Sequence, residues 1–503
     1  MDQSIDRPPY GVIIILMIGA FISFLNNTLL NVALPSIMSD LNVGPATVQW
    51  LSTGFMLVSG ILIPTTAFLI QKYSVRHLFL AAIGLFAVGT ILAGVAHVFP
   101  VLLAGRLLQA AGSAVLSPLL MNVMLVSFPI EKRGQVMGIF GLILMFAPAI
   151  GPTLSGWIVE HYNWRMLFHF ISPIAIVVFL IGFFLLKDKK EKVNMSMDVV
   201  SLILSSLGFG GILYGFSSAG NAGWSSPIVY GTIIIGVVSL TTFILRQFKF
   251  KEPFLNFRVY QYPMFALSSV ISMVVNMAIF SGMILLPIYV QNIRGISPMD
   301  AGLLMLPGAI LMAFMSPLTG RLFDKFGGRV LAIVGLTITV ITTFAFSQLE
   351  MDTTYGYLLL IYSVRSVGMS MVFMPVSTNG LNQLPRRLYP HGTAMNNTLN
   401  QVAGAIGTAL MVTLMTTYAN SRAKELTATA MEKLTGQPTE AALTQMQDQI
   451  MMQATLDGIN FSFLVSAGIA FVALVLSFFI KRATPMEEKP SEVKFKEKAV
   501  VGQ

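Results

Sequence analysis

The feature that most limits how this chain can fold is a series of apolar segments of 18 or more residues, which recur along most of its 503 residues. A segment of that length can cross the hydrocarbon core of a bilayer as an α-helix. Only 11% of the residues are charged and 55% are hydrophobic, which is too little charge to cover the surface of a soluble protein of this size. The sequence therefore predicts an all-α membrane protein with many spans.

Hydropathy and helix-breaking residues together predict fourteen transmembrane helices. Their expected ranges are 12–34, 47–71, 78–97, 100–126, 134–157, 167–187, 198–218, 227–245, 263–290, 300–322, 329–348, 355–380, 392–418 and 459–480. The first apolar run is longer than the core of a signal peptide, so we expect it to be retained as a helix. The chain has no cysteine, which excludes disulfides and thiolate metal sites.

The distribution of Lys and Arg tests this number of helices. With the N-terminus in the cytoplasm, 24 of the 31 Lys and Arg residues fall on the inner side and 5 on the outer side. The remaining two, Arg106 and Arg365, fall within helices. Because cytoplasmic loops are enriched in Lys and Arg, this split predicts a multi-pass protein of the cell membrane with both termini cytoplasmic. The same loops explain the net charge of +9, so we expect membrane lipid as a partner and no nucleic acid.

An internal repeat organises the helices into two halves. The segment AFLIQKYSVRHL (67–78) aligns with GRLFDKFGGRVL (320–331), and Arg106 has a counterpart in Arg365. Two parallel halves around a site near the midplane are a plan of secondary transporters. We predict an N-terminal six-helix bundle over 1–190, two inserted helices within 191–250, and a C-terminal six-helix bundle over 251–484.

Two segments are expected to lie outside this bundle. Residues 419–457 form a predicted external loop with helical character, which is either a solvated cap or a lid over the outer vestibule. The tail, residues 485–503, mixes Lys with Glu and lacks a continuous apolar face, so it is predicted to be a disordered cytoplasmic segment.

Four motifs resemble those of the major facilitator superfamily, specifically its fourteen-helix drug:proton antiporters (the EmrB/QacA-like group), and among these the lincomycin-resistance exporters of the LmrB type. They are LNNTLLNVALP (25–35) in the first helix, GRLLQAAG (105–112) in the fourth, the span 138–156 in the fifth, and GRLFDKFGGR (320–329) in a cytoplasmic loop. The resemblance covers nearly the whole chain. It implies two six-helix bundles plus two extra helices. We expect no cofactor, no bound metal and a monomer as the functional unit.

The resemblance assigns the span 138–156 to the antiporter motif and the two repeated loops to gating. Small residues at helical spacing allow helices to approach closely, and proline can bend a helix. The antiporter-motif residues are Gly138, Ala147, Gly151, Pro152 and Gly156, with Ala147 where the family prefers Gly. The gating residues are Lys72, Arg76, Asp324, Gly327 and Arg329. The first loop has Gln71 where the family usually has Asp, so we expect a stronger latch at Asp324.

Amide side chains within the helices predict a polar cavity. The first-helix motif usually carries an acid where this chain has Asn26, and all 22 acids of the chain map to loops or helix ends. Each amide can also be structural, as a hydrogen bond between helices. The predicted cavity residues are Asn26, Asn27, Asn31, Asn122, Asn276, Asn396, Asn397, Asn400, Gln401 and Arg365.

Arg106, its neighbour Gln109 and His169 are candidates for proton coupling. Arg106 keeps its charge at mid-helix and needs partners, which Gln109 or the amides of the first helix can provide. His169 has a suitable reference pKa, although a lone histidine on an aromatic face is more often structural. Acids near helix ends are further candidates: Asp40, Asp198, Asp300 and Asp457.

The expected function is proton-coupled export of small amphiphilic compounds, with protons as the second substrate. Without an acid at the midplane, neutral, zwitterionic or weakly polar compounds fit better than dications. The 31 Met and 36 Phe residues can supply an adaptable apolar wall. A dedicated exporter of an endogenous lipid or metabolite and a passive facilitator remain alternatives. The sequence has no nucleotide-binding phosphate loop and no HExxH metal motif, so neither an ATP-driven pump nor an enzyme is expected.

Overall fold

The computed structural model of the protein describes residues 10–187, 198–250, 253–433 and 440–482, and within these ranges the regular structure is entirely helical. Thirteen stretches of the described chain are long and apolar enough to cross a membrane. A further helix, α7 (Ile130–His161), runs through the bundle against α1 and α12. The architecture is consistent with the fourteen predicted helices. The predicted disordered tail at 485–503 lies outside the described residues.

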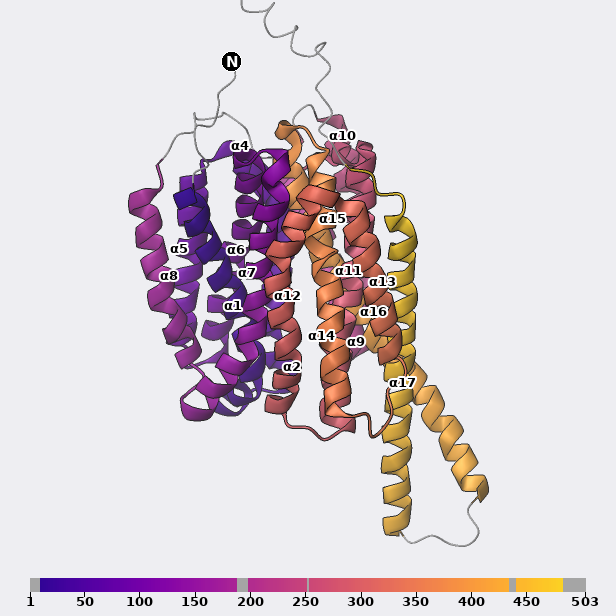
Figure 1. Cartoon of the computed structure of the whole chain (residues 1–503). Helices are drawn as coiled ribbons and strands as arrows, with labels where there is room; N and C mark the ends of the chain where they lie inside the picture. Colours follow the sequence, from indigo (N-terminus) through magenta and orange to yellow (C-terminus); the bar gives the residue numbers. More distant parts are fainter. Residues whose placement is uncertain (1–9, 188–197, 251–252, 434–439, 483–503) are drawn as a thin grey trace, which may run out of the picture.

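The helices of the N-terminal half lie together on one side of the molecule (Figure 1), and they form six spans, one of which is interrupted. Its helices are α1 (Tyr10–Leu41), α2 (Pro45–Val48), α3 (Trp50–Leu62), α4 (Thr66–Lys72), α5 (Val75–Gly94), α6 (Phe99–Ser127), α7 and α8 (Met166–Leu185). A 3-10 turn, η1 (Ile63–Thr65), joins α3 to α4. Pro64 within this turn has no backbone N–H to donate, which explains why the second span is not one continuous α-helix.

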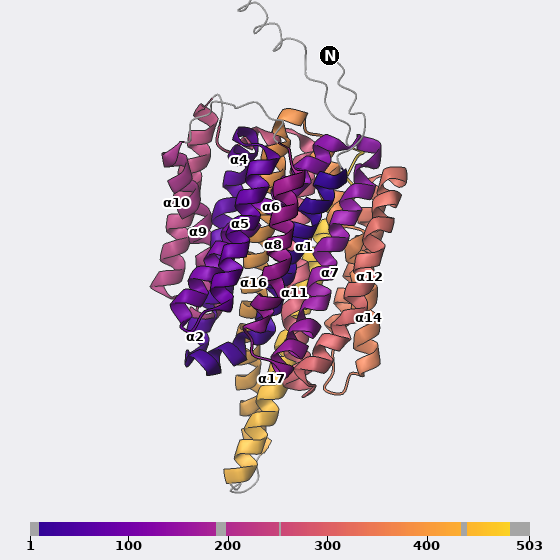
Figure 2. The same cartoon turned by 90° about the vertical axis from the view of Figure 1, so that its left-hand side faces the viewer.

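Two inserted helices, α9 (Val199–Ala222) and α10 (Pro227–Lys249), pair with each other. Asp198 caps α9 and forms an ion pair with Arg246 of α10, at 2.9 Å. This contact with Arg246 lowers the pKa of the Asp198 carboxyl to about 2. Helix α9 packs on α3 and on α16 of the other half, and α10 lies on the outside of the pair (Figure 2).

The C-terminal half repeats the six-span plan. Its elements are η2 (Phe257–Gln261), α11 (Pro263–Ile288), the π-helix η3 (Tyr289–Ile293), α12 (Pro298–Phe326), α13 (Gly328–Phe346), α14 (Tyr355–Ser370), α15 (Phe373–Asn382), η4 (Arg386–Leu388), α16 (Tyr389–Lys433) and α17 (Glu440–Ser477). Gly327 ends α12 and adopts φ 80°, a left-handed conformation that favours glycine.

Helices α16 and α17 continue well beyond the bundle. The segment predicted as an external loop, 419–457, is mostly helical, with the chain between Lys433 and Glu440 left undescribed. The two helices project away from the bundle as a hairpin in both side views and do not fold back over it (Figures 1 and 2). Arg422 of α16 contacts Asp457 of α17 at 2.9 Å, which ties the base of the hairpin together.

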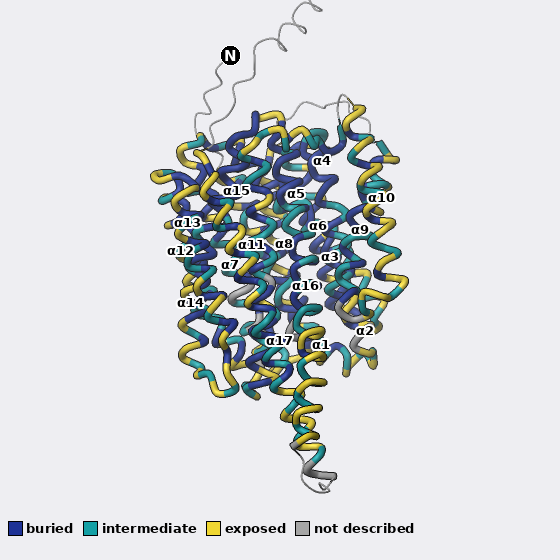
Figure 3. The backbone as a smooth tube through the Cα atoms, turned by 90° about the vertical axis from the view of Figure 1, so that its right-hand side faces the viewer, coloured by how far each residue is buried: buried dark blue, intermediate teal, exposed yellow. Residues whose placement is uncertain are grey.

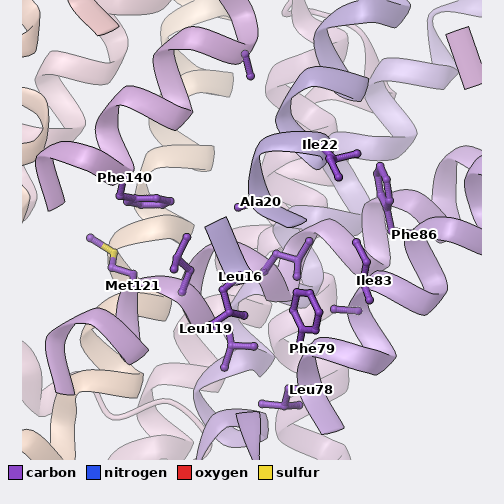
Figure 4. Close-up of a cluster of buried hydrophobic side chains, with 14 of the residues drawn as sticks. Leu16, Ala20, Ile22, Leu78, Phe79, Ile83, Phe86, Leu119, Met121 and Phe140 are labelled. Atoms are coloured by element: carbon purple, nitrogen blue, oxygen red, sulfur yellow. The ribbon is translucent and has the colours of Figure 1, made fainter. Parts of the chain in front are cut away.

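Burial follows the pattern of a protein in a lipid solvent. Much of the outer helix α10 is exposed (Figure 3), and its exposed residues include Ile234 and Val238. Phe184 at the end of α8 is 75% exposed. The interior of the N-terminal half is also apolar: α1, α5, α6 and α7 bring together Leu16, Phe79, Leu119 and Phe140 (Figure 4). Apolar residues therefore cover the outside of the bundle and also fill its interior. Buried polar residues are the exception, so they indicate where a functional site can lie.

Candidate functional site

A cavity of about 250 Å³ lies between the two halves. Helices α1, α3, α6 and α7 form its wall on the N-terminal side, and α11, α15 and α16 form the opposite wall. None of the described residues that line it is ionisable. The lining residues are Ala20, Ser23, Phe24, Asn27, Phe55, Ser59, Ile63, Ser113, Ala114, Leu116, Ser117, Met121, Phe140, Leu144, Ser272, Asn276, Phe373, Met374, Ser377, Asn396, Asn397, Asn400 and Gln401.

Six of the predicted cavity amides line this space. They are Asn27, Asn276, Asn396, Asn397, Asn400 and Gln401. Asn276 Nδ2 donates to Asn400 Oδ1 at 2.9 Å, and Ser117 Oγ of the N-terminal half donates to Asn397 Oδ1 of the C-terminal half at 3.0 Å. The amides therefore bond to one another and across the two halves, and the same groups face the cavity.

The other predicted cavity residues lie elsewhere. Asn26 is buried outside the lining, and its Nδ2 has no protein partner among the described residues. Asn122 is also buried outside the lining. The side chain of Asn31 lies outside the described part of the structure. Neighbouring asparagines on one helix point in different directions, so they cannot all face one cavity.

Aromatic rings and methionines supply the apolar part of the lining. Phe24, Phe55, Phe140 and Phe373 surround the amides, with Met121 and Met374 between them. The sequence predicts Met and Phe as wall-forming residue types, but it does not single out these six side chains among its 31 Met and 36 Phe residues. A mixed wall of rings, thioethers and neutral polar groups suits an amphiphilic ligand.

Arg106 is fully buried directly behind this wall. Its Nη1 donates to Gln109 Oε1 at 2.8 Å, and its Nη2 donates to Asn27 Oδ1 at 3.1 Å, so both predicted kinds of partner hold it. Its Cζ lies 4.5 Å from the centroid of the Phe55 ring. Gln109 Nε2 donates in turn to Thr90 Oγ1 of α5 at 2.8 Å. All of these partners are neutral, so dipoles and a ring face stabilise the buried charge.

The cavity and the buried guanidinium are directly connected. Asn27 and Phe55 each present one face to the cavity and the other to Arg106. A ligand that moves either side chain therefore changes the contacts of the guanidinium. Thr90 was not identified from the sequence, because a threonine within an apolar helix usually bonds to its own backbone, as Thr90 also does to Phe86 O.

Arg365 has an equivalent place on α14 but does not line the cavity. It is buried, and its Nε donates to Thr343 Oγ1 of α13 at 3.2 Å. Its Nη2 donates to the carbonyl of Ala278 on α11 at 2.6 Å. Arg365 was predicted to line the cavity, but its side chain is turned toward α11 and α13 of its own half instead. A threonine of the preceding span lies near each buried arginine, but Thr343 bonds to Arg365 directly, whereas Thr90 reaches Arg106 only through Gln109.

The two halves also bond to each other at the end where α1 begins and α17 ends, called the inner end below (Figure 1). Asp324, at the end of α12, accepts from the backbone N–H groups of Gly134 at 2.8 Å and Gln135 at 2.9 Å. These N–H groups belong to the first turns of α7, where the helix dipole favours negative charge. With the contacts of Gln71 and Arg133 described below, these bonds join the two halves at the inner end, which is closed in this structure.

The equivalent loop of the N-terminal half makes a different contact. Gln71 Nε2 lies 3.0 Å from His391 Nε2 at the start of α16. Lys72 Nζ lies 5.4 Å from the centroid of the Phe68 ring, and Arg76 Nη2 donates to the carbonyl of Phe183 at 3.1 Å. The repeat is therefore preserved in position, with an amide and an imidazole where the other half has a carboxylate and backbone N–H groups.

Arg133 is a further bridge that was not singled out from the sequence. It is buried, and its Nη1 donates to Asn382 Oδ1 on α15 at 3.1 Å. Its Nε and Nη2 donate to the carbonyls of Phe128 and Leu125, and its Cζ lies 5.0 Å from the Tyr389 ring centroid. Arg133 lies in a loop that the sequence predicts to be cytoplasmic, where basic residues are expected, so nothing in the sequence singled out this residue.

Gly327 and Arg329, which the sequence predicts to be gating residues, lie at the same end. Gly327 provides the turn between α12 and α13, and Arg329 is exposed in the first turn of α13.

The antiporter motif contacts both halves. Gly138 faces α12 of the other half, where Ser316 Oγ donates to its carbonyl at 2.8 Å. A Cβ at Gly138 would lie 2.5 Å from the backbone oxygen of Ser316, so only glycine fits without a shift. Gly151 faces Thr28 of α1 in its own half, and Thr28 Oγ1 donates to the carbonyl of Ala147 at 3.4 Å.

The other two residues of the antiporter motif are Pro152 and Gly156. Gly156 has open space at its Cβ position, with no atom within 4 Å. The side chain of Pro152 lies outside the described part of the structure.

The histidine predicted as a proton carrier is separated from this network. His169 is exposed on α8, near Gly94 of α5. Of the acids near helix ends, Asp40 pairs with Arg165 at 2.7 Å, and this contact lowers the pKa of the Asp40 carboxyl. Asp198 and Asp457 also bond to arginines, whereas Asp300 bonds to Ser297 in the first turn of α12.

Comparisons with known proteins agree with the geometry. A sequence model of the Major Facilitator Superfamily matches residues 16–408. The chain is 46% identical to the MFS-type transporter YhcA of Bacillus subtilis, with 97% of this chain and 96% of that protein covered. It is 41% identical to the lincomycin resistance protein LmrB of the same organism, over 94% of this chain and 95% of that protein. The human organic anion transporter MFSD10 has a similar fold, with a TM-score of 0.64 at 14% identity, covering 94% of this chain and 100% of that one.

Proposed function

The chain belongs to the Major Facilitator Superfamily, and we propose that it is a proton-coupled exporter of amphiphilic drugs or toxic small molecules across the cell membrane. Its similarity to lincomycin resistance proteins supports export of a drug-like compound. The observation that carries the proposal is the contact between the cavity and Arg106 through Asn27 and Phe55. It joins a ligand-sized space to a buried charge whose surroundings must change when the halves move.

The lining suggests which compounds are accepted. The described residues that surround the cavity offer amides, hydroxyls and rings and no carboxylate. A lipophilic dication would leave water without a counter-charge, which is costly in a low-dielectric site. We therefore expect neutral, zwitterionic or weakly polar amphiphiles to be transported better than dications.

A single proton per cycle is sufficient for useful export. Moving one charge through about 150 mV yields roughly 3.5 kcal/mol, which supports a gradient of a few hundredfold. Asp324 is the acid best placed to respond to the movement of the halves, because its carboxylate connects α12 to α7. Arg106 is expected to act by repositioning rather than by losing its proton.

Transport by purified protein in proteoliposomes tests the proposal. Lincomycin and a lipophilic dication are compared under an imposed pH gradient and, separately, under an imposed voltage. Accumulation of lincomycin driven by the pH gradient supports proton-coupled export, whereas gradient-independent equilibration indicates a passive facilitator. Failure to move any drug, together with a changed metabolite profile in a deletion strain, indicates export of an endogenous compound.

Arg106→Ala and Arg106→Lys distinguish a coupling role from a structural one. Alanine leaves the acceptors of Gln109 and Asn27 unpaired, at about 1–3 kcal/mol each, and lysine keeps the charge without the fork geometry. We expect Arg106→Ala to abolish gradient-driven export and Arg106→Lys to retain part of it, while both bind lincomycin. Full gradient-driven export by Arg106→Ala contradicts this assignment.

A further inference from the structure

A second cavity, separate from the substrate cavity, lies at the inner end between the two halves. Its volume is about 620 Å³. One wall is the connection from α6 to α7, including Glu131 and Arg133, and the other is the connection from α15 to α16, including Arg386, Arg387 and Tyr389. No step of the proposed transport cycle uses this inner pocket.

The charged residues that line the inner pocket are mostly basic. Three arginines and one acid, Glu131, are its ionisable lining groups among the described residues, apart from the tyrosine. Arg386 and Arg387 are exposed, and Arg133 is only 4% exposed at the back of the pocket. The contacts of Arg133 are carbonyls, an amide and the Tyr389 ring, all of them neutral, so its charge is not cancelled there.

The backbone also contributes positive electrostatic potential to the inner pocket. Helix α7 begins at Ile130 and α16 begins at Tyr389, so the positive ends of two helix dipoles border the same pocket. The exposed arginines provide directional donors for a tetrahedral oxyanion, because guanidinium groups bind phosphate in a bidentate manner.

The position of the inner pocket favours a ligand at the membrane surface. Tyr10, at the start of α1, is 58% exposed and packs edge-on against the lining residue Phe128, with ring centroids 6.0 Å apart. Aromatic side chains of this kind collect at the level of the lipid headgroups. Basic pockets between helices on the cytoplasmic side are a known form of headgroup site.

We infer that the inner pocket binds the phosphate group of an anionic ligand, either a phospholipid headgroup such as phosphatidylglycerol or a soluble phosphate ester. Because its walls belong to opposite halves, the bound phosphate holds them together and favours the conformation closed at the inner end. The inference is independent of the substrate and of proton coupling.

Native mass spectrometry of the purified full-length protein measures this binding. Phosphatidylglycerol is titrated against phosphatidylcholine, and sn-glycerol 3-phosphate is added as a competitor to separate lipid from soluble phosphate. We expect phosphatidylglycerol to bind in preference to phosphatidylcholine, and R386Q/R387Q to weaken it by about 30-fold. Competition by glycerol phosphate identifies a general phosphate site, and its absence identifies a lipid site.

Two further variants make the result specific. K249Q/R258Q removes two exposed positive charges from the inner end outside the pocket, and it is expected to change the affinity by less than about threefold. E131Q removes the acid found among the described lining residues and is expected to strengthen binding. This effect remains measurable if R386Q/R387Q does not fold. Equal affinities of wild type and R386Q/R387Q, an equal loss in K249Q/R258Q, weaker binding by E131Q, or no binding of either phosphate compound overturns the inference.

Discussion

Replacing Asp324 by Asn is expected to open the inner end of the protein. The carboxylate accepts two backbone N–H groups from the first turns of α7, at 2.8 and 2.9 Å. An asparagine has one carbonyl oxygen for these two donors, and its NH₂ group is then placed against the second N–H. The contact is also very close, because a Cβ on Gly134 would overlap both the Asp324 carboxylate and the backbone of Gly320.

The free energy that Asp324→Asn removes from the closed inner end can be estimated from these contacts. A hydrogen bond to a charged group contributes about 1.5–3 kcal/mol, and a carboxylate at a helix N-terminus gains about 0.3–1 kcal/mol more. Asp324 is partly buried and one hydrogen bond is retained, so we expect a net loss of about 2 kcal/mol for the closed inner end. That loss shifts the ratio of closed to open inner ends by roughly 30-fold.

The chain has no cysteine, so pairs of introduced cysteines can carry spin labels without a background. A pair at Lys132 and Val330 reports on the inner end, and a pair at Tyr162 and Asp352 reports on the outer end; all four side chains are exposed. In Asp324→Asn, double electron–electron resonance should show a longer inner distance and a shorter outer one.

Asp300→Asn is the matched control for this experiment. It makes the same substitution at the other end of α12, where the carboxylate bonds to Ser297 of its own first turn. The reasoning is refuted if Asp324→Asn leaves both distance distributions unchanged, or if Asp300→Asn shifts them equally.

Three further predictions concern packing, coupling and pH. Gly138→Ala should reduce drug export in proteoliposomes at least tenfold, because overpacking against a backbone oxygen costs about 1–3 kcal/mol, whereas Gly156→Ala, with open space at its Cβ, should be close to wild type. Thr90→Val should lower gradient-driven export more than drug binding measured by calorimetry, since it removes the acceptor of Gln109; equal losses in both would indicate general misfolding. Asp198 has its pKa lowered to about 2 by Arg246, so its contribution to stability is present above its unfolded pKa of about 3.9 and is lost as the pH falls toward 2. Thermal unfolding of wild type and Asp198→Asn should therefore differ at pH 6 and converge near pH 2, and a constant difference would exclude this origin.

The sequence by itself determined the class of fold. Long apolar runs require helices in a bilayer, because every backbone polar group must then be satisfied within its own segment. The sequence also identified Arg106 with Gln109 and a first-helix amide as partners, since a charge in a membrane helix needs neutral donors and acceptors nearby. The predicted sidedness and proton coupling remain predictions.

Only the tertiary structure decided which polar residues act together. Transmembrane helices are apolar on both their lipid-facing and their inward surfaces, so hydropathy does not reveal which face is turned inward. Asn27 therefore lines the cavity while Asn26 does not, and Arg365 turns toward its own half. The bridge from Asp324 to the start of α7 and the basic inner pocket join segments that are far apart in the chain, and such contacts depend on how the two halves are packed.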